Sequence, residues 1–254
     1  MILEARNITK EFSVEKGFLM QEKTTVRALD NVSFSLAEFT TLGIVGESGS
    51  GKTTLAKIIT RLIPATSGQV LVNTDSIRAF RKDVQIIFQN PYNSLDPRMR
   101  IRDAVSEPLA IHRIVPPGKF RDRCVELLRS VGLDETALER YPKEFSGGQR
   151  QRICIARALA CEPKLLVLDE PLSSLDLTIQ ARLLDLFIEL KKRFALTYVF
   201  ISHNLSVVRH ISDNVAVMQN GRVVEEGTAA ALFQDPRQPY TRQLLAAARS
   251  NNHP

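Results

Sequence analysis

A glycine-rich run, Gly46-Glu-Ser-Gly-Ser-Gly-Lys-Thr53, is the part of this 254-residue sequence that points most directly to chemistry. Its spacing is G-x-x-x-x-G-K-[ST], in which glycines let consecutive backbone N–H groups turn inward toward an anion. We expect Lys52 to reach the outer phosphates of a nucleotide and the Thr53 hydroxyl to bind Mg²⁺. The run therefore predicts a nucleoside triphosphate site with these contacts: Gly46, Ser48, Gly49, Ser50, Gly51, Lys52, Thr53 and Thr54.

A second run, Ser146-Gly-Gly-Gln149, precedes a segment at 150–161 in which apolar residues recur at helical spacing. Ser146 is a favourable N-cap, and Gly147 and Gly148 would let a ligand approach the backbone closely. The positive end of the helix dipole faces the same point, so this helix start is suited to an anion. By itself the pattern also fits an ordinary capped helix.

Two adjacent acids, Asp169 and Glu170, follow the apolar run Leu165–Leu168. Such a run indicates a central parallel strand that is buried on both faces. Acids at the C-terminal end of a strand of this kind lie where α/β proteins bind ligands. We expect Asp169 to hold Mg²⁺ through water and Glu170 to polarise an attacking water. A solvated acidic turn is the alternative for two adjacent acids alone.

The elements that must position these residues can be placed from the hydrophobic pattern. A buried strand at 41–45 leads into the glycine-rich run, and a helix at 54–62 follows it. The stretch 13–25 is expected to be a loop extension. Further strands are expected at 3–7, 31–36, 69–72 and 198–202, the first three in a sheet at the nucleotide end, and a core-packing helix at 178–193.

Together these features resemble the ATP-binding-cassette (ABC) ATPases, from Leu3 to about Ala247. The resemblance implies an α/β fold with a P-loop NTPase (RecA-like) core, an antiparallel β subdomain and an inserted helical subdomain. It implies a single ABC ATPase domain over 1–254. Within it, the nucleotide-binding core covers 1–89 and 161–235, the helical subdomain 90–160, and the C-terminal helix and tail 236–254.

Family resemblance also implies roles for single residues. Gln89 matches the glutamine that contacts the metal and relays to a transmembrane partner, and Asp176 lies in the segment that crosses a dimer interface. His203 matches the catalytic switch histidine on the γ-phosphate. Phe12 matches the aromatic that stacks on adenine, with Phe18 as a rival and core packing as the alternative for Phe12.

In this family one chain contributes half of each of two ATP sites in a head-to-tail dimer. The run Ser146 to Gln149 is therefore expected to close over the γ-phosphate bound by a second ABC ATPase subunit, either a copy or a paralogue. ATP and Mg²⁺ are the expected cofactors.

Two segments, Asn90–Arg98 and Asp235–Ala246, are similar to the branch that serves oligopeptide, dipeptide and nickel importers. The resemblance implies an ATPase that powers import, most simply of peptides, with nickel or a metal chelate as the alternative. It also implies two transmembrane permease subunits, a solute-binding protein outside the cell, and a peripheral location on the cytoplasmic face of the inner membrane. Asn204 stands where many members have Asp, and Asn can equally cap the following helix.

Composition narrows the cofactors, membrane segments and partners that can be expected. No cysteine follows Cys161, so the iron–sulfur cluster of many relatives is not expected, and the three cysteines are expected to be buried thiols. The sequence contains no run of eighteen apolar residues, which is about the length needed to span a bilayer. Met1 leads directly into a strand-like segment, so no secretory leader is expected. The net charge of +6 is spread over separate clusters. This disfavours nucleic acid as a partner, and a soluble ABC protein acting on nucleic acid or ribosomes is the less favoured alternative.

Overall fold

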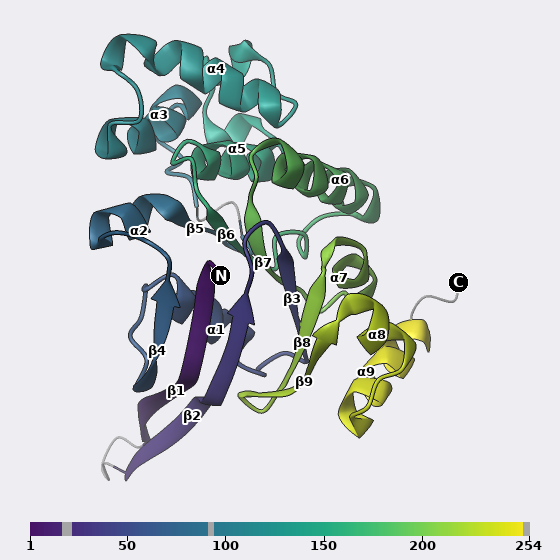
Figure 1. Ribbon diagram of the computed structural model, residues 1–254. Helices are drawn as coiled ribbons and strands as arrows, with labels where there is room; N and C mark the ends of the chain where they lie inside the picture. The colour runs from purple at the N-terminus through teal and green to yellow at the C-terminus, as the bar shows by residue number, and fades with distance from the viewer. Residues whose placement is uncertain (17–21, 91–93, 251–254) are drawn as a thin grey trace. The chain divides into compact units, whose positions relative to one another are not determined.

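The computed structural model describes residues 1–16, 22–90 and 94–250, and Figure 1 labels their helices and strands. The chain divides into two compact units. One is formed by Met1–Asn73 with Val199–Pro254, and the other by Thr74–Tyr198. The residues expected to do chemistry are distributed over both units, and each unit is described by itself.

An antiparallel sheet forms one part of the first unit. Its strands are β1 (Leu3–Lys16), β2 (Glu22–Leu36) and β4 (Ser67–Val72), in the order β2-β1-β4. Leu3 pairs with Leu36 on one side and with Val72 on the other. Leu3 and Leu36 are buried, which gives the sheet an apolar inner face. The expected antiparallel β subdomain is therefore present.

The prediction of a loop extension over residues 13–25 is wrong for the parts that the structure describes, 13–16 and 22–25. There β1 and β2 continue as a paired ribbon, with Ser13 opposite Thr25 and Lys16 opposite Glu22. Ser13, Thr25 and Val26 are all exposed, so at these positions the ribbon needs no apolar side chain. Without a period of two in hydrophobicity, the sequence carries no clear strand signal here, although Thr and Val favour extended backbone.

The rest of the first unit is an α/β arrangement. Strand β3 (Thr41–Val45) is buried throughout and pairs in parallel with β8 (Asn214–Gln219), which pairs antiparallel with β9 (Arg222–Thr228). The strand β7 (Thr197–Ile201) crosses the boundary between the units, and directly after it Ser202 N–H donates to the Ile44 carbonyl at 3.2 Å. The helices are α1 (Lys52–Ile59), α7 (Leu205–Ile211), α8 (Ala229–Gln234) and α9 (Pro239–Ser250).

The second unit contains two parallel strands and most of the helices. Strand β5 (Val84–Ile87) pairs with β6 (Leu165–Asp169), with Val84 opposite Leu165. Between them, the described residues form helices and turns but no strand. The helices of the unit are α2 (Ile77–Asp83), α3 (Ile101–His112), η2 (Pro117–Lys119), α4 (Phe120–Ser130), η3 (Glu135–Glu139), η4 (Pro142–Glu144), α5 (Gly147–Leu159) and α6 (Leu177–Arg193).

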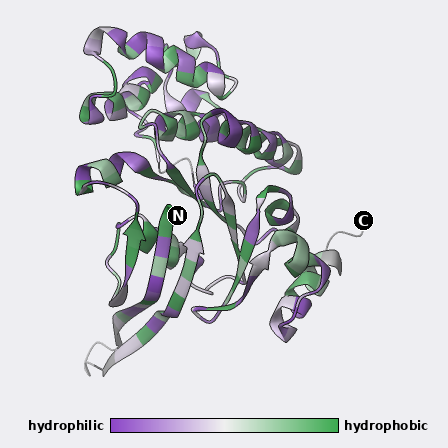
Figure 2. Cartoon of the chain, in the orientation of Figure 1, coloured by the Kyte–Doolittle hydropathy of each residue, from purple (hydrophilic) through white to green (hydrophobic). Residues whose placement is uncertain are grey.

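Hydropathy follows these elements. Figure 2 shows green, apolar residues along the central strands, whereas the helices alternate between green and purple as amphipathic helices do. Cys124, Cys154 and Cys161 are buried, as expected, and burial raises the pKa of these thiols to about 11, about 12 and about 11. Among the described residues, no helix combines the length and the apolar character that crossing a bilayer requires.

Candidate functional site

The glycine-rich loop, residues 46–53, connects β3 to α1 in the first unit. Gly46 has a φ of +153°, and a Cβ there would lie 2.2 Å from the carbonyl oxygen of Met218. Gly51 has a φ of +102°, and a Cβ there would lie 2.6 Å from the carbonyl oxygen of Ala28. Both positions therefore require glycine, because the backbone is left-handed and its neighbours leave no room for a side chain. The helix α1 begins at Lys52, two residues before the predicted start.

Lys52 is folded into this loop. Its side chain is only 5% exposed, and Nζ donates to the carbonyl oxygens of Gly46 at 2.8 Å and Glu47 at 2.7 Å and to Ser50 Oγ at 3.3 Å. A cation is thus held among oxygen acceptors at the start of α1, beside the positive end of the helix dipole. Phosphate oxygens are acceptors of the same kind, so Lys52 can exchange these contacts for a nucleotide.

The other predicted residues of the first unit lie near the surface. Thr53 is exposed and Thr54 is half-buried. Phe12 is 39% exposed, with Lys10 Nζ 5.0 Å from the centre of its ring, so it is not a core residue and its face can attract another group. Phe18, its rival, lies outside the described residues.

His203 is exposed and follows β7, as the pattern predicts. The next residue, Asn204, caps α7 by accepting hydrogen bonds from the N–H groups of Ser206 at 3.1 Å and Val207 at 3.3 Å. The expectation that Asn can fulfil the capping role of Asp is confirmed. His203 is thereby held at the junction of a buried strand and a capped helix.

In the second unit the structure brings Gln89 and Glu170 together. Gln89 Nε2 donates to Glu170 Oε2 at 3.3 Å. The contact arises because β5 and β6 are parallel neighbours and both side chains lie just beyond the C-terminal ends of these strands. Asp169, the last residue of β6, is 3% exposed. Gln89, which is assigned to the metal, and Glu170, which is assigned to catalysis, therefore belong to one cluster.

Glu170 has an unusual backbone conformation, with a φ of +50°. A left-handed conformation costs a residue with a side chain about 1–2 kcal/mol. The turn is held by Ser173, whose N–H and hydroxyl donate to the Glu170 carbonyl at 3.3 Å and 3.1 Å. The side chain is consequently set at a sharp turn between β6 and the segment before α6. Backbone strain of this kind is common where a side chain must be directed at a ligand.

The signature loop, Ser146–Gln149, starts α5 with a capping box. Ser146 Oγ accepts from Gln149 N–H at 3.3 Å, and Gln149 Oε1 accepts from Ser146 N–H at 3.0 Å. Ser146 is thus the predicted N-cap. The reciprocal bond of the Gln149 side chain was not predicted, although S-x-x-Q is its sequence signal.

Gly148 of the signature loop lies against α6. A Cβ there would be 2.7 Å from Ile179 Cγ2. Ile179 N–H in turn donates to Asp176 Oδ1 at 2.9 Å, so Asp176 is the N-cap of α6. The sequence pattern predicts only core packing for the helix at 178–193, which includes Ile179, and the family resemblance implies only a dimer interface for Asp176. In the structure Ile179 also lies against Gly148 of the signature loop, and Asp176 caps the helix that carries Ile179.

Replacing Gly148 with alanine is expected to destabilise the protein by about 1–3 kcal/mol, because the new methyl group overlaps Ile179. The measurement is urea or thermal unfolding of the single variant. The double variant Gly148→Ala with Ile179→Ala should recover most of the loss, since the shorter side chain makes room. Gly118, which has nothing within 4 Å of a Cβ, provides the matched glycine control. A double variant less stable than the single one would contradict this account.

Comparison with known proteins agrees with this geometry. The family model described as ABC transporter matches residues 29–173. The di/tripeptide transport ATP-binding protein DppF of Pseudomonas aeruginosa is 47% identical over 97% of this chain and 78% of its own length. The glutathione import ATP-binding protein GsiA of Escherichia coli K12 is 45% identical over 97% of this chain, which spans 41% of that relative.

A solved structure supports the same fold. It is a dimeric ATP-binding cassette in a post-hydrolysis state bound to ADP and Pi, with a TM-score of 0.77 and 28% sequence identity. The match covers 90% of this chain and 99% of the other. The expected P-loop NTPase fold is confirmed. Since the family model matches more than half of the chain and a relative is 47% identical over nearly all of it, the chain belongs to the ABC transporter family and is one of its ATPases.

Proposed function

We propose that this chain is the ATP-hydrolysing subunit of an importer that carries peptides across the cell membrane. The observation that carries the cargo class is the similarity to a di/tripeptide transport ATP-binding protein, at 47% identity. The similarity to a glutathione import ATP-binding protein, at 45% identity, points to the same class because glutathione is itself a small peptide. The chain would act at the cytoplasmic face of the membrane as a peripheral subunit.

The glycine-rich loop and Thr54 are the proposed triphosphate site, and Phe12 is the proposed support for adenine. Thr53, Gln89 and, through water, Asp169 are the proposed Mg²⁺ ligands. Their hydroxyl, amide and carboxylate oxygens fit the preference of this cation for oxygen ligands. Since Gln89 already donates its amide nitrogen to Glu170, its oxygen is the atom suited to a cation. When bound, Mg²⁺ would neutralise charge on the phosphates.

Glu170 and His203 are the proposed catalytic residues. Glu170 would accept a proton from the attacking water, and His203 would donate a hydrogen bond to a γ-phosphate oxygen. The contact between Gln89 and Glu170 supports this role, because it holds the carboxylate beside a residue assigned to the metal. Hydrolysis then depends on a carboxylate that is fixed before the nucleotide arrives.

The proposed partner in each ATP site is a second ABC ATPase subunit, a copy or a paralogue, placed head to tail. Ser146 and Gln149 are exposed, as are Asp176 and the neighbouring Leu177, which is 80% exposed. An exposed leucine beside a capped helix start is suited to burial against another protein. The solved relative is itself dimeric. The signature loop would close over the γ-phosphate bound by the opposing subunit.

We further propose that residues 90–160 form the helical subdomain and that it receives the permease subunits. A cavity of about 650 Å³ in the second unit is lined by residues of this stretch, among them Leu95, Pro97, Met99 and Glu107. Arg157 closes one side, donating to the Ser94 carbonyl at 2.6 Å. The segment that lines this groove begins a few residues after Gln89, which contacts Glu170. A permease loop seated here could therefore affect the catalytic glutamate through one short segment.

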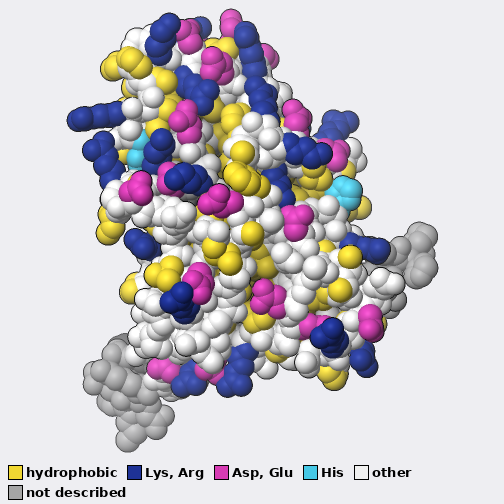
Figure 3. Space-filling view, viewed as in Figure 1, with side chains coloured by type: hydrophobic (Ala, Val, Ile, Leu, Met, Phe, Trp, Pro, Cys, Tyr) yellow, Lys and Arg dark blue, Asp and Glu magenta, His cyan; other side chains and the backbone are white. Residues whose placement is uncertain are grey.

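Nucleic acid is not the proposed partner. Lysine and arginine side chains are interspersed with acidic ones on the face shown in Figure 3. Three of the basic side chains are also paired with one carboxylate: Arg100, Arg102 and Arg121 contact Glu139 at 2.8, 2.9 and 3.5 Å. A groove for a phosphate backbone would instead need basic side chains that are available to phosphates.

Uptake of a labelled tripeptide by vesicles containing the reconstituted complex tests the proposal. We expect ATP-dependent uptake with the wild-type chain and none when ATP is omitted. In the same assay, Met99→Trp should abolish uptake by filling the groove, whereas Lys119→Trp, at an exposed position, should not. Uptake of nickel or a metal chelate without peptide would contradict the proposed cargo. Full uptake by the Met99 variant would contradict the docking site.

A further inference from the structure

The start of α9 is held by a carboxylate of β9. The N–H groups of Arg237 and Gln238, just before the helix, donate to Glu225 Oε1 at 2.8 Å and Oε2 at 3.0 Å. Burial raises the pKa of Glu225, but the nearby Thr241 hydroxyl and these two amides outweigh burial and hold the pKa below its ordinary value. Glu225 is therefore ionised at neutral pH and fixes where α9 begins.

One residue of α9 contacts the glycine-rich loop. The hydroxyl of Tyr240 accepts a hydrogen bond from the backbone N–H of Glu47 at 3.2 Å. The residues beside it hold the helix in place, since Thr241 is 1% and Leu245 is 8% exposed. Tyr240 therefore reaches the loop from a part of the helix whose neighbouring side chains are buried.

Both backbone polar groups of Glu47, its carbonyl and its N–H, have hydrogen-bond partners. Its carbonyl oxygen accepts from Lys52 Nζ at 2.7 Å and from Ser50 N–H at 3.2 Å, and both donors lie within the loop. The N–H partner, Tyr240, lies 193 residues away. When Lys52 turns toward phosphate oxygens, the Glu47 carbonyl loses this donor, but the bond to Tyr240 need not break. Tyr240 is then a support of the loop that remains while the nucleotide is bound.

We propose that Tyr240 is a positioning residue for nucleotide binding, which rests on the proposed role of the glycine-rich loop as the triphosphate site. Its hydroxyl orients the backbone N–H of Glu47, and through it the loop whose inward-facing amides receive phosphate. Glu225 acts through Tyr240 by fixing the start of α9. The C-terminal helix is in this way a component of the nucleotide site.

Replacing Tyr240 with phenylalanine tests this directly, because only the hydroxyl is lost. We expect the Kd of ATP and the KM of hydrolysis to rise about fivefold, which corresponds to about 1 kcal/mol, the value of one hydrogen bond. The kcat at saturating ATP should stay within twofold of the wild type, because the catalytic glutamate is not touched. Tyr141→Phe, in the second unit, is the matched control and should leave both constants unchanged.

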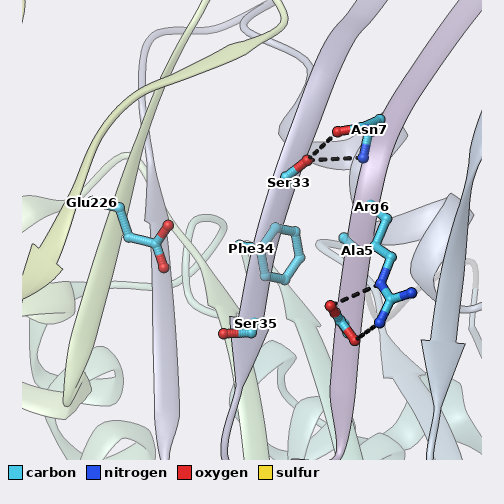
Figure 4. Close-up of a pocket in the computed structure, with 8 residues that line it drawn as sticks. Ala5, Arg6, Asn7, Ser33, Phe34, Ser35 and Glu226 are labelled. Carbon is cyan, nitrogen blue, oxygen red and sulfur yellow. Dashed lines mark hydrogen bonds and ion pairs between the residues drawn. The ribbon is translucent and has the colours of Figure 1, made fainter.

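A double-mutant cycle tests the role of Glu225. Glu225→Ala should raise the Kd of ATP in the same direction, and adding Tyr240→Phe should raise it little further, because both changes remove one support. Glu226→Ala is the adjacent control: successive side chains of a strand point to opposite faces. Glu226 instead lines a pocket of the first unit with Arg6, Ser33 and Phe34 (Figure 4).

Three results test the proposed roles of Tyr240 and of the glycine-rich loop, once circular dichroism shows that the variants are folded. A fivefold rise in KM at constant kcat, with non-additivity in the cycle, supports the proposal. Wild-type affinity in Tyr240→Phe, together with lost binding in Lys52→Ala, overturns the role of Tyr240 alone. Wild-type affinity in Lys52→Ala overturns the assignment of the loop and with it this inference.

Discussion

Replacing Glu170 with glutamine is expected to lower the kcat of ATP hydrolysis at least 100-fold while the Kd of ATP stays within about threefold of the wild type. Glutamine has nearly the same shape, and its oxygen can still accept the hydrogen bond that Gln89 donates at 3.3 Å. What is lost is the ability to take a proton from water. Positioned acid–base groups contribute about 10²–10⁴ to rate, so the loss should be large and confined to chemistry.

The measurement is steady-state release of phosphate by the assembled complex, with nucleotide affinity measured separately. Glu162→Gln is a suitable control, because Glu162 shares the left-handed backbone conformation, with a φ of +52°, but lies in an ion pair with Arg123. It should hydrolyse ATP at the wild-type rate. Normal turnover by the Glu170 variant would show that another group activates the water.

Replacing Lys52 with alanine is expected to weaken ATP binding about 100-fold, which corresponds to about 2.8 kcal/mol. The ammonium group donates to three oxygen acceptors of the loop at 2.7–3.3 Å and is 5% exposed. Its loss removes a charge-assisted contact to phosphate. It also leaves the Gly46 and Glu47 carbonyls short of a donor, so the loop is less well ordered before the nucleotide arrives.

Titration with a fluorescent ATP analogue measures this effect, and thermal unfolding separates it from loss of fold. Lys57→Ala, in the same helix and half-buried, is the matched control and should bind nucleotide normally. Equal weakening in both lysine variants would point to a general loss of positive charge rather than to a specific contact of Lys52.

Local features of the site were predictable because they depend on residues a few positions apart. The glycine spacing at Gly46 and Gly51 specifies a backbone that only glycine adopts easily, and the structure has positive φ at both. Ser146 and Asn204 are good caps for the same reason, since a cap bonds amides two or three residues ahead. Strand β3 was predictable with its bounds because Leu42, Ile44 and Val45 make it a short, mostly apolar run of the kind that is buried on both faces.

The ribbon of β1 and β2 was missed for a physical reason. Its strands are stabilised by backbone pairing with each other, as between Ser13 and Thr25, rather than by burial of one face. Hydrophobic periodicity reports burial, so a ribbon exposed on both faces gives no period. The capping role of Asp176 was missed because the family resemblance had already assigned it another role.

The sequence by itself determined the family, the glycine-rich loop, the helix caps at Ser146 and Asn204 and the identities of the candidate catalytic residues, because each depends on the order and spacing of neighbouring residues. Only the tertiary structure decided which distant residues meet. Gln89 reaches Glu170 across 81 residues because β5 and β6 are parallel neighbours. Tyr240 reaches Glu47 across 193 residues because Glu225 fixes the start of α9. Such contacts depend on strand pairing and helix placement, which no local spacing encodes.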